Sequence, residues 1–150
     1  VKLTVGKDDR FSSIHDKWVR EADAVFGWYE QIETIEVETI RLDMLLWRYG
    51  NFDFIKIDTE GHEPAVIRSL GAHRPKRMSL EYHGGKCLLQ SMLGVTEEAL
   101  SLVGNDYTCR FAAESRRWVS GWVEVQEAIQ MLPELDWGDL YLVSKSEFTG

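Results

Sequence analysis

The polar side chains best suited to chemistry gather in one short run, Asp58–Glu63 (DTEGHE). An apolar, strand-like segment ends at Asp58, and a helix-like segment with a proline in its first turn follows Glu63. In open α/β sheets, ligands bind beside the carboxyl ends of the strands, where loops surround a crevice. The sequence therefore predicts that Asp58 and Glu60 stand at the edge of a sheet, in a position to bind a ligand or to take part in its chemistry.

A second pair of titratable residues closes the next segment with strand character, Met78–His83 (MSLEYH), which contains Glu81 and ends at His83. If this strand lies beside the one that ends at Asp58, then Asp58, Glu60, Glu81 and His83 converge. The arrangement of the strands thus decides whether these residues form one site.

Most of these residues also have a purely structural interpretation. Asp58 and Glu60 can cap the following helix or interact with its dipole. Glu63 directly precedes a proline, so it is better explained as a cap than as a catalyst. His62 is compatible with a surface loop. Glu81 is harder to explain in this way, because a carboxylate that closes a buried strand needs a partner.

No established metal or nucleophile motif is present. The oxygen-rich run matches neither an EF-hand nor an HExxH spacing, so we expect no bound metal. The chain also contains no P-loop and no GxSxG segment. Gly84-Gly85 either shapes a loop around a ligand or only turns the chain. Arg116, Arg117 and Trp118 suggest a flat, basic recognition surface, with an ordinary exposed loop as the alternative.

The composition is that of one globular domain spanning all 150 residues. Its net charge of -8 repels phosphate backbones, so we expect no nucleic-acid partner. Cys87 and Cys109 belong to no CxxC pair and are predicted to be reduced, buried thiols of a cytoplasmic protein. No apolar run approaches the roughly 20 residues that a membrane span requires, and no signal peptide opens the chain, so we expect no membrane association.

Strands that alternate with helices predict an α/β fold built on a mostly parallel sheet. Leu42–Tyr49 has the apolar spacing of a helix, which Gly50 would end. Phe52–Asp58 is expected to be a buried parallel strand, and Thr96 to cap a helix that runs to Gly104. The other expected elements are strands at Val1–Val5, Ile32–Ile40, Met78–His83, Tyr107–Ala112 and Asp139–Ser144, a helix from Pro64 to Gly71, and a helix or an ordered loop over 14–31.

The segment FDFIKIDTEGHEPAVIRSL resembles the signature of FkbM-type methyltransferases, an apolar residue followed by Lys-Ile-Asp-x-Glu-Gly-x-Glu. Upstream, VETIRLDMLL resembles the family's Val-x-Thr-x-x-Leu-Asp segment, and Ser12-Ser13 resembles its small-Ser-Ser loop. Downstream, PKRMSLEYH resembles the family's strand that ends in Glu, NDYTCRF its Gly-Tyr stretch, and GDLYLVSK its closing strand. The likeness spans nearly the whole chain in the expected order, and its central segment is the most specific part.

This resemblance implies a class I methyltransferase fold, a Rossmann-like, mostly parallel sheet with an antiparallel final strand. It also implies transfer of a methyl group from S-adenosylmethionine, usually to a hydroxyl oxygen, here of a small molecule or a glycan. Asp58 would then lie beside the methyl donor and the acceptor. On this basis the predicted catalytic residues are Asp58, Glu60 and His83, with Asp58 also contacting the cofactor, and the predicted substrate-binding residues are Glu81, His62 and Arg117.

The chain departs from the family pattern at one point. The family carries a glycine-rich donor loop on its first strand and an acidic residue on its second, whereas this sequence contains no Gly-x-Gly. We therefore expect a C-terminal portion of the fold that lacks the donor-binding strands and has an exposed apolar edge where they would pair. The alternatives are a non-catalytic methyltransferase-like binding module or relic, and an acidic metal-dependent hydrolase. The methyl acceptor and the oligomeric state stay open.

Overall fold

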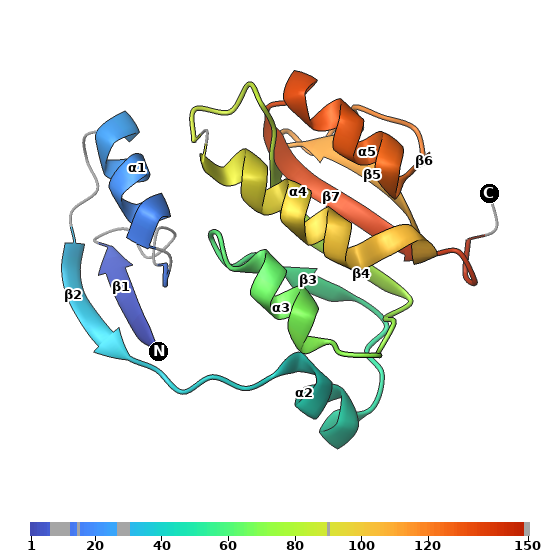
Figure 1. Ribbon diagram of the computed structural model, residues 1–150, viewed down its shortest axis with the longest axis horizontal. Coiled ribbons are helices and arrows are strands. Elements are labelled where there is room, and N and C mark those ends of the chain that lie inside the picture. The colour runs from blue at the N-terminus through green and yellow to red at the C-terminus, as the bar shows by residue number, and fades with distance from the viewer. Residues whose placement is uncertain (7–12, 15, 27–30, 90, 149–150) are drawn as a thin grey trace.

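The computed structural model describes residues 1–6, 13–14, 16–26, 31–89 and 91–148 (Figure 1). Within these residues, five strands form a sheet in the order β3-β4-β7-β5-β6. The strands are β3 (Ile55–Ile57), β4 (Arg77–His83), β5 (Tyr107–Ala113), β6 (Val123–Glu124) and β7 (Trp137–Ser144).

This sheet is mixed, so the prediction of a mostly parallel sheet is wrong. Among the described strands only β3 and β4 pair in parallel; β7 is antiparallel to both β4 and β5, and β6 is antiparallel to β5. The sheet is mixed because β7 lies between β4 and β5, which run in the same direction, and is antiparallel to both. The predicted antiparallel final strand is therefore confirmed, whereas the five strands do not establish a Rossmann-like arrangement.

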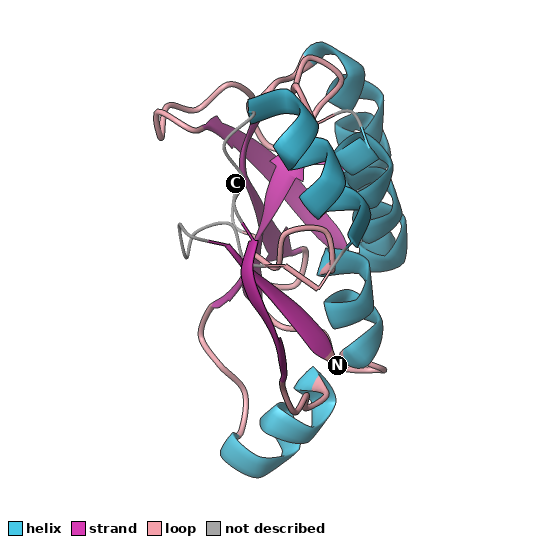
Figure 2. Ribbon diagram, turned by 90° about the vertical axis from the view of Figure 1, so that its left-hand side faces the viewer, coloured by secondary structure: helices cyan, strands magenta, loops and turns pink. Residues whose placement is uncertain are grey.

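Three helices cover one face of the sheet, α3 (Glu63–Ser69), α4 (Ser91–Val103) and α5 (Val125–Met131), and Figure 2 shows the helices on one side of the strands. The core lies between these two layers. Leu80, Leu140 and Phe111 stand side by side across β4, β7 and β5 and are fully buried. Because alternate residues of a strand point to opposite faces, the neighbours of these residues lie on the other face of the sheet.

The N-terminal elements form a separate two-stranded antiparallel sheet, β1 (Lys2–Gly6) and β2 (Gln31–Glu36), with helix α1 (Asp16–Phe26) between them in sequence. Both strands agree with the strands expected at Val1–Val5 and Ile32–Ile40. The segment 14–31, expected to be either a helix or an ordered loop, contains α1. Trp18 of α1 packs against Cys87, Leu89 and Met92, which attaches this unit beside the loop that follows β4. Ser12 of the predicted Ser-Ser loop lies outside the described residues.

The edge of the sheet at β3 is exposed, so the prediction that Phe52–Asp58 forms a buried strand is wrong for its first residues. The predicted strand shrinks to three residues, and Phe54 before it is 47% exposed. Helix α2 (Leu42–Tyr49) ends at Gly50 as predicted, but it buries only Leu46 and leaves Trp47 86% exposed. Within the described residues β3 pairs with β4 alone, so its outer edge has no strand partner there.

The prediction that Thr96 caps a helix is wrong, because α4 begins at Ser91 and Thr96 lies buried within it. Short 3-10 helices at Gly104–Asp106 (η2) and Leu132–Glu134 (η3), together with β6 and α5, were not predicted. Both cysteines are free and buried, as expected. Among the described helices, none combines the length and the apolar character needed to cross a bilayer.

Candidate active site

Three of the predicted site residues meet where β3 and β4 end side by side. One side-chain ligand atom from each of Glu60, Glu81 and His83 lies within 4.8 Å of the other two. Glu60 follows β3, whereas Glu81 and His83 belong to β4, and the parallel pairing brings both carboxyl ends to the same edge. The convergence expected for neighbouring strands is thus present for these three side chains.

Asp58 stands beside this group rather than in it. Its Oδ2 lies 3.1 Å from Nζ of Lys56, and the same Nζ lies 3.0 Å from Oδ1 of Asp139 on β7. Burial disfavours the charge of Lys56, but the hydrogen bonds to Asp139 and Asp58 outweigh it and raise the pKa of Lys56. Lys56 therefore holds two carboxylates at the edge of the sheet, one of them the partly exposed Asp58.

The turn that carries Glu60 is stabilised by hydrogen bonds with the nearby Glu63 and with the distant Ser13. Glu60 has a φ of 50° and Gly61 a φ of 101°, so both occupy the left-handed region. The buried carboxylate of Glu63 accepts hydrogen bonds from the Thr59 N–H (2.8 Å), the Thr59 hydroxyl (2.9 Å) and the Gly61 N–H (3.1 Å). The hydroxyl of Ser13 donates to the Glu60 carbonyl at 2.8 Å. Glu63 is therefore structural rather than catalytic, but it is not the predicted cap: it is the first residue of α3, and its carboxylate fixes the turn that presents Glu60.

Glu60 is a carboxylate in an unfavourable setting for its charge. Burial is the largest cause, and the negative charges of Glu81 and Asp58 add to it, while His83 partly opposes them; together they raise the pKa of Glu60 to about 8. Such strongly perturbed carboxyl groups are found more often at functional sites than elsewhere.

His83 is buried and held at both ring nitrogens. Nε2 lies 3.3 Å from Oε2 of Glu81, and Nδ1 lies 3.4 Å from Sγ of Cys87. Its backbone N–H donates to the Thr96 hydroxyl at 3.0 Å, and this hydroxyl in turn donates to the Met92 carbonyl. Burial disfavours the charged imidazole, but the hydrogen bonds with Cys87 and Glu81 outweigh it and raise the pKa of His83 to about 10.

A comparison with known protein families identifies the family of this chain. Residues 3–135 match the model of the methyltransferase FkbM domain. The chain belongs to the FkbM methyltransferase family. A search of curated proteins and a search of solved structures gave no match. The matched range contains the acidic turn, all of β4 and the Thr96 position, so every residue of the group described above lies within the FkbM domain.

The other predicted site residues of this FkbM domain are not members of the group of three. His62 is the N-cap residue of α3 and is half-buried. Arg117 is exposed in the turn after β5, and β7 lies between β5 and β4. Because β4 and β5 run in the same direction, Arg117 is nevertheless on the same edge of the sheet as His83.

The glycine pair after β4 has a packing role in the FkbM domain. A Cβ on Gly84 would lie 2.3 Å from the Leu135 carbonyl oxygen, and one on Gly85 would lie 2.5 Å from that of Pro133. The Gly85 N–H donates to the Leu132 carbonyl at 2.8 Å. Of the two interpretations left open by the sequence, the structure therefore favours a chain turn packed closely on η3.

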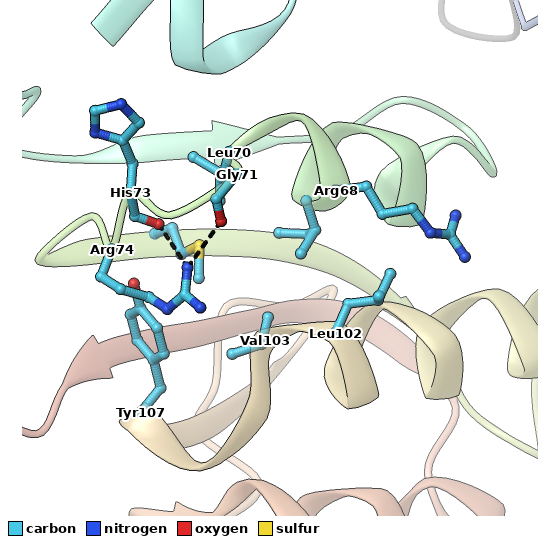
Figure 3. A pocket seen from close by; sticks show the side chains of 10 residues that line it. Arg68, Leu70, Gly71, His73, Arg74, Leu102, Val103 and Tyr107 are labelled. Carbon is cyan, nitrogen blue, oxygen red and sulfur yellow. Dashed lines mark hydrogen bonds between the residues drawn. The ribbon is translucent and has the colours of Figure 1, made fainter.

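A cavity of about 170 Å³ opens at the opposite edge of the sheet, where β4 and β5 begin. Figure 3 shows its lining from the ends of α3 and α4, together with Tyr107 at the start of β5. Nη1 of Arg74 donates there to the carbonyls of Gly71 (3.1 Å) and His73 (3.0 Å). Since this cavity lies at the other end of the strands, it contains none of the converging carboxylates.

Two contributors to the site, Cys87 and Thr96, were not identified from the sequence. Cys87 follows His83 by four residues, a spacing that brings side chains together in a helix. The intervening residues form a turn rather than a helix, so that spacing carried no usable signal. Thr96 reaches His83 only because α4 packs on β4.

Proposed function

We propose that this FkbM domain transfers a methyl group from S-adenosylmethionine to a hydroxyl oxygen of a small molecule or a glycan. The observation that carries the proposal is the meeting of Glu60, Glu81 and His83 at the carboxyl edge of β3 and β4, within a member of a methyltransferase family. Ligands bind at this edge in open α/β sheets.

The acidic edge suits the reacting end of the donor, which carries a positive sulfonium group. A carboxylate at roughly 7 Å from such a charge, at an effective dielectric constant of about 20, would stabilise it by about 2 kcal/mol. Asp58 and Glu81 supply carboxylates there, while the raised pKa of Glu60 favours its neutral form. The adenosine end has no such match, because the sequence contains no Gly-x-Gly and β3 has no outer neighbour among the described strands. We therefore assign to these residues only contacts near the transferred methyl group.

The chain's own task is to align the acceptor and to receive its proton. Bound S-adenosylmethionine would supply an activated methyl group, so that much of the rate enhancement can come from in-line positioning and exclusion of water. We assign proton acceptance to Asp58, because the raised pKa values of Glu60 and His83 favour their protonated forms at neutral pH. Glu60 and His83 are assigned to alignment of the acceptor, with Glu81 orienting the imidazole of His83 through Nε2. The turn fixed by Glu63 and Ser13 holds Glu60 in place for this role.

We assign His62 and Arg117 to acceptor binding, because both follow strands whose carboxyl ends lie on the reacting edge. The partner is then a small molecule or a glycan rather than a nucleic acid, which the net charge of -8 disfavours. Two free, buried cysteines support a cytoplasmic location.

The test is calorimetric titration with S-adenosylmethionine and with S-adenosylhomocysteine, which lacks the positive charge, in the presence of a chelator. We expect saturable binding of both compounds. The Asp58→Asn variant should weaken S-adenosylmethionine roughly 10- to 30-fold more than S-adenosylhomocysteine, because it removes one carboxylate from the field of the sulfonium. Methyl-labelled donor and a panel of hydroxyl compounds then test transfer.

The matched control is Asp53→Asn, an exposed aspartate that precedes β3 and so lies toward the opposite edge of the sheet. It should leave both affinities unchanged. Absence of binding by either compound would contradict the proposed function and favour a non-catalytic domain. Equal weakening of the two compounds by Asp58→Asn would contradict the placement of the sulfonium.

A further inference from the structure

The group formed by Glu60, Glu81 and His83 has the composition and the size of a metal-ion site. Two carboxylate oxygens and one imidazole nitrogen lie within 4.8 Å of one another, and His83 is buried. The two carboxyl groups and the imidazole face each other at a partly buried edge, where positive charge stabilises carboxylates. We propose that these three residues bind one divalent transition-metal ion.

The separations are close to those of a coordination sphere. With metal–ligand distances of about 2.0–2.2 Å, ligand atoms around one ion stand roughly 3 to 4.4 Å apart. Nε2 of His83 and Oε2 of Glu81 are 3.3 Å apart, inside this range. The largest separation in the group, up to 4.8 Å, requires only a small closure. Glu60 can supply it, because its long side chain extends from a loop.

The neighbours of His83 orient it as a ligand. Sγ of Cys87 accepts the Leu89 N–H at 3.4 Å and lies 3.4 Å from Nδ1 of His83. With the Nδ1 proton directed at this sulfur, an ion on the side of Glu81 displaces the proton of Nε2 and takes its lone pair. Metal-binding histidines characteristically donate their second ring N–H in this way. The Thr96 hydroxyl additionally holds the backbone of His83.

This ligand set differs from the acidic run that the sequence displays. Glu63 already accepts hydrogen bonds from the turn, and Asp58 pairs with Lys56. The structure selects Glu60 from that run and combines it with two residues of β4. Because these ligands come from two separate segments, no metal motif is visible along the chain.

The donor atoms indicate which ions the site prefers. Imidazole nitrogen favours first-row transition metals, whereas Mg²⁺ and Ca²⁺ favour oxygen ligands only. One nitrogen with two carboxylates therefore suits Mn²⁺ and Zn²⁺ better than Mg²⁺. Binding of the ion does not depend on methyl transfer; a further role, in which the ion holds the acceptor oxygen, rests on the proposed function.

The test is titration of the chelator-stripped, 150-residue chain with Mn²⁺ alone, followed by the electron paramagnetic resonance signal of free Mn²⁺. Zn²⁺ and Mg²⁺ are titrated by calorimetry. We expect one ion per chain, with Zn²⁺ tightest and Mg²⁺ at least tenfold weaker than Mn²⁺. Glu60→Gln, Glu81→Gln and His83→Gln should each weaken Mn²⁺ at least tenfold.

Matched controls are Glu114→Gln and His73→Gln, which alter an exposed glutamate and an exposed histidine that are not members of the group. They should leave the affinity for Mn²⁺ unchanged. Cys87→Ala, which changes no ligand, should weaken Mn²⁺ about 10- to 100-fold through the orientation of His83. Circular dichroism verifies the fold of each variant. If a variant of Glu81 or His83 on β4 unfolds, the Glu60→Gln variant, which alters a loop residue, still tests metal binding.

Two results would overturn the proposal: no saturable binding of Mn²⁺ or Zn²⁺, or binding that the three ligand variants leave unchanged. The titration with S-adenosylmethionine described above is performed in chelator, and the metal titration is performed without donor. A negative result in the donor titration therefore contradicts only the proposed function, and a negative result in the metal titration contradicts only the metal site.

Discussion

Glu63 offers the sharpest test of how the acidic turn is built. Glu63 is 3% exposed, and its carboxylate accepts hydrogen bonds from the N–H groups of Thr59 and Gly61 and from the Thr59 hydroxyl. The Glu63→Ala substitution removes this acceptor and leaves the two backbone N–H groups without it. We expect the variant to be strongly destabilised, although Glu63 contacts no substrate in the proposed function.

The magnitude follows from the two amides. Each N–H left unsatisfied in a buried setting costs about 1–3 kcal/mol, so Glu63→Ala should lower the free energy of unfolding by about 2–6 kcal/mol. Native domains have only about 5–15 kcal/mol in total. Glu63→Gln keeps one carbonyl oxygen that can accept from Thr59, so it should cost less, about 1–2 kcal/mol.

The assay is urea unfolding at neutral pH, followed by tryptophan fluorescence and circular dichroism. The order wild type, Glu63→Gln, Glu63→Ala is the expected order of decreasing stability. If Glu63→Ala unfolded within about 1 kcal/mol of wild type, the hydrogen bonds of this turn would not have the structural weight assigned to them. An amide variant less stable than the alanine variant would refute the reasoning in the same way.

Three further substitutions are checked by the same urea unfolding. Gly84→Ala should destabilise by about 1–3 kcal/mol or more, because its Cβ would stand 2.3 Å from the Leu135 carbonyl oxygen; an unchanged midpoint would contradict that close packing. Gly94→Ala should stabilise by up to about 1 kcal/mol, since Gly94 lies within α4 and a Cβ there meets nothing within 4 Å; a loss of stability would show an unrecognised contact. Thr96→Val should lower the free energy of unfolding by about 1–3 kcal/mol, because the buried His83 N–H loses its acceptor. An unchanged stability would show that Thr96 does not stabilise the backbone of His83.

Elements governed by local patterns were predictable. The apolar spacing of Leu42–Tyr49 and the glycine after it predicted α2 and its end, and Pro64 marked the first turn of α3. Both depend on neighbouring residues, because helix periodicity and terminal residues act within one or two turns. The prediction for Thr96 was wrong because it used only the neighbouring residues, among which Thr96 resembles a cap. In the structure Thr96 lies within α4, which packs on β4, and its hydroxyl accepts the backbone N–H of His83.

The order and direction of the strands were less accessible. The closing segment was expected to be the antiparallel final strand, and β7 is antiparallel to both of its neighbours. Its insertion between β4 and β5 makes most of the pairings antiparallel, which pattern along the chain does not reveal. Pairing partners are distant in sequence, so strand periodicity identifies a strand without identifying its neighbours.

The linear sequence by itself determined the membership in the FkbM family, the position of most helices and strands, and the residue types that end β3 and β4. Only the tertiary structure decided which of those side chains meet. It separated Glu63 and Asp58 from the group and joined Glu60 to Glu81 and His83. The physical reason is that a site of a few ångströms depends on strand pairing and on hydrogen bonds between distant segments, and neither is encoded in the spacing of residues along one segment.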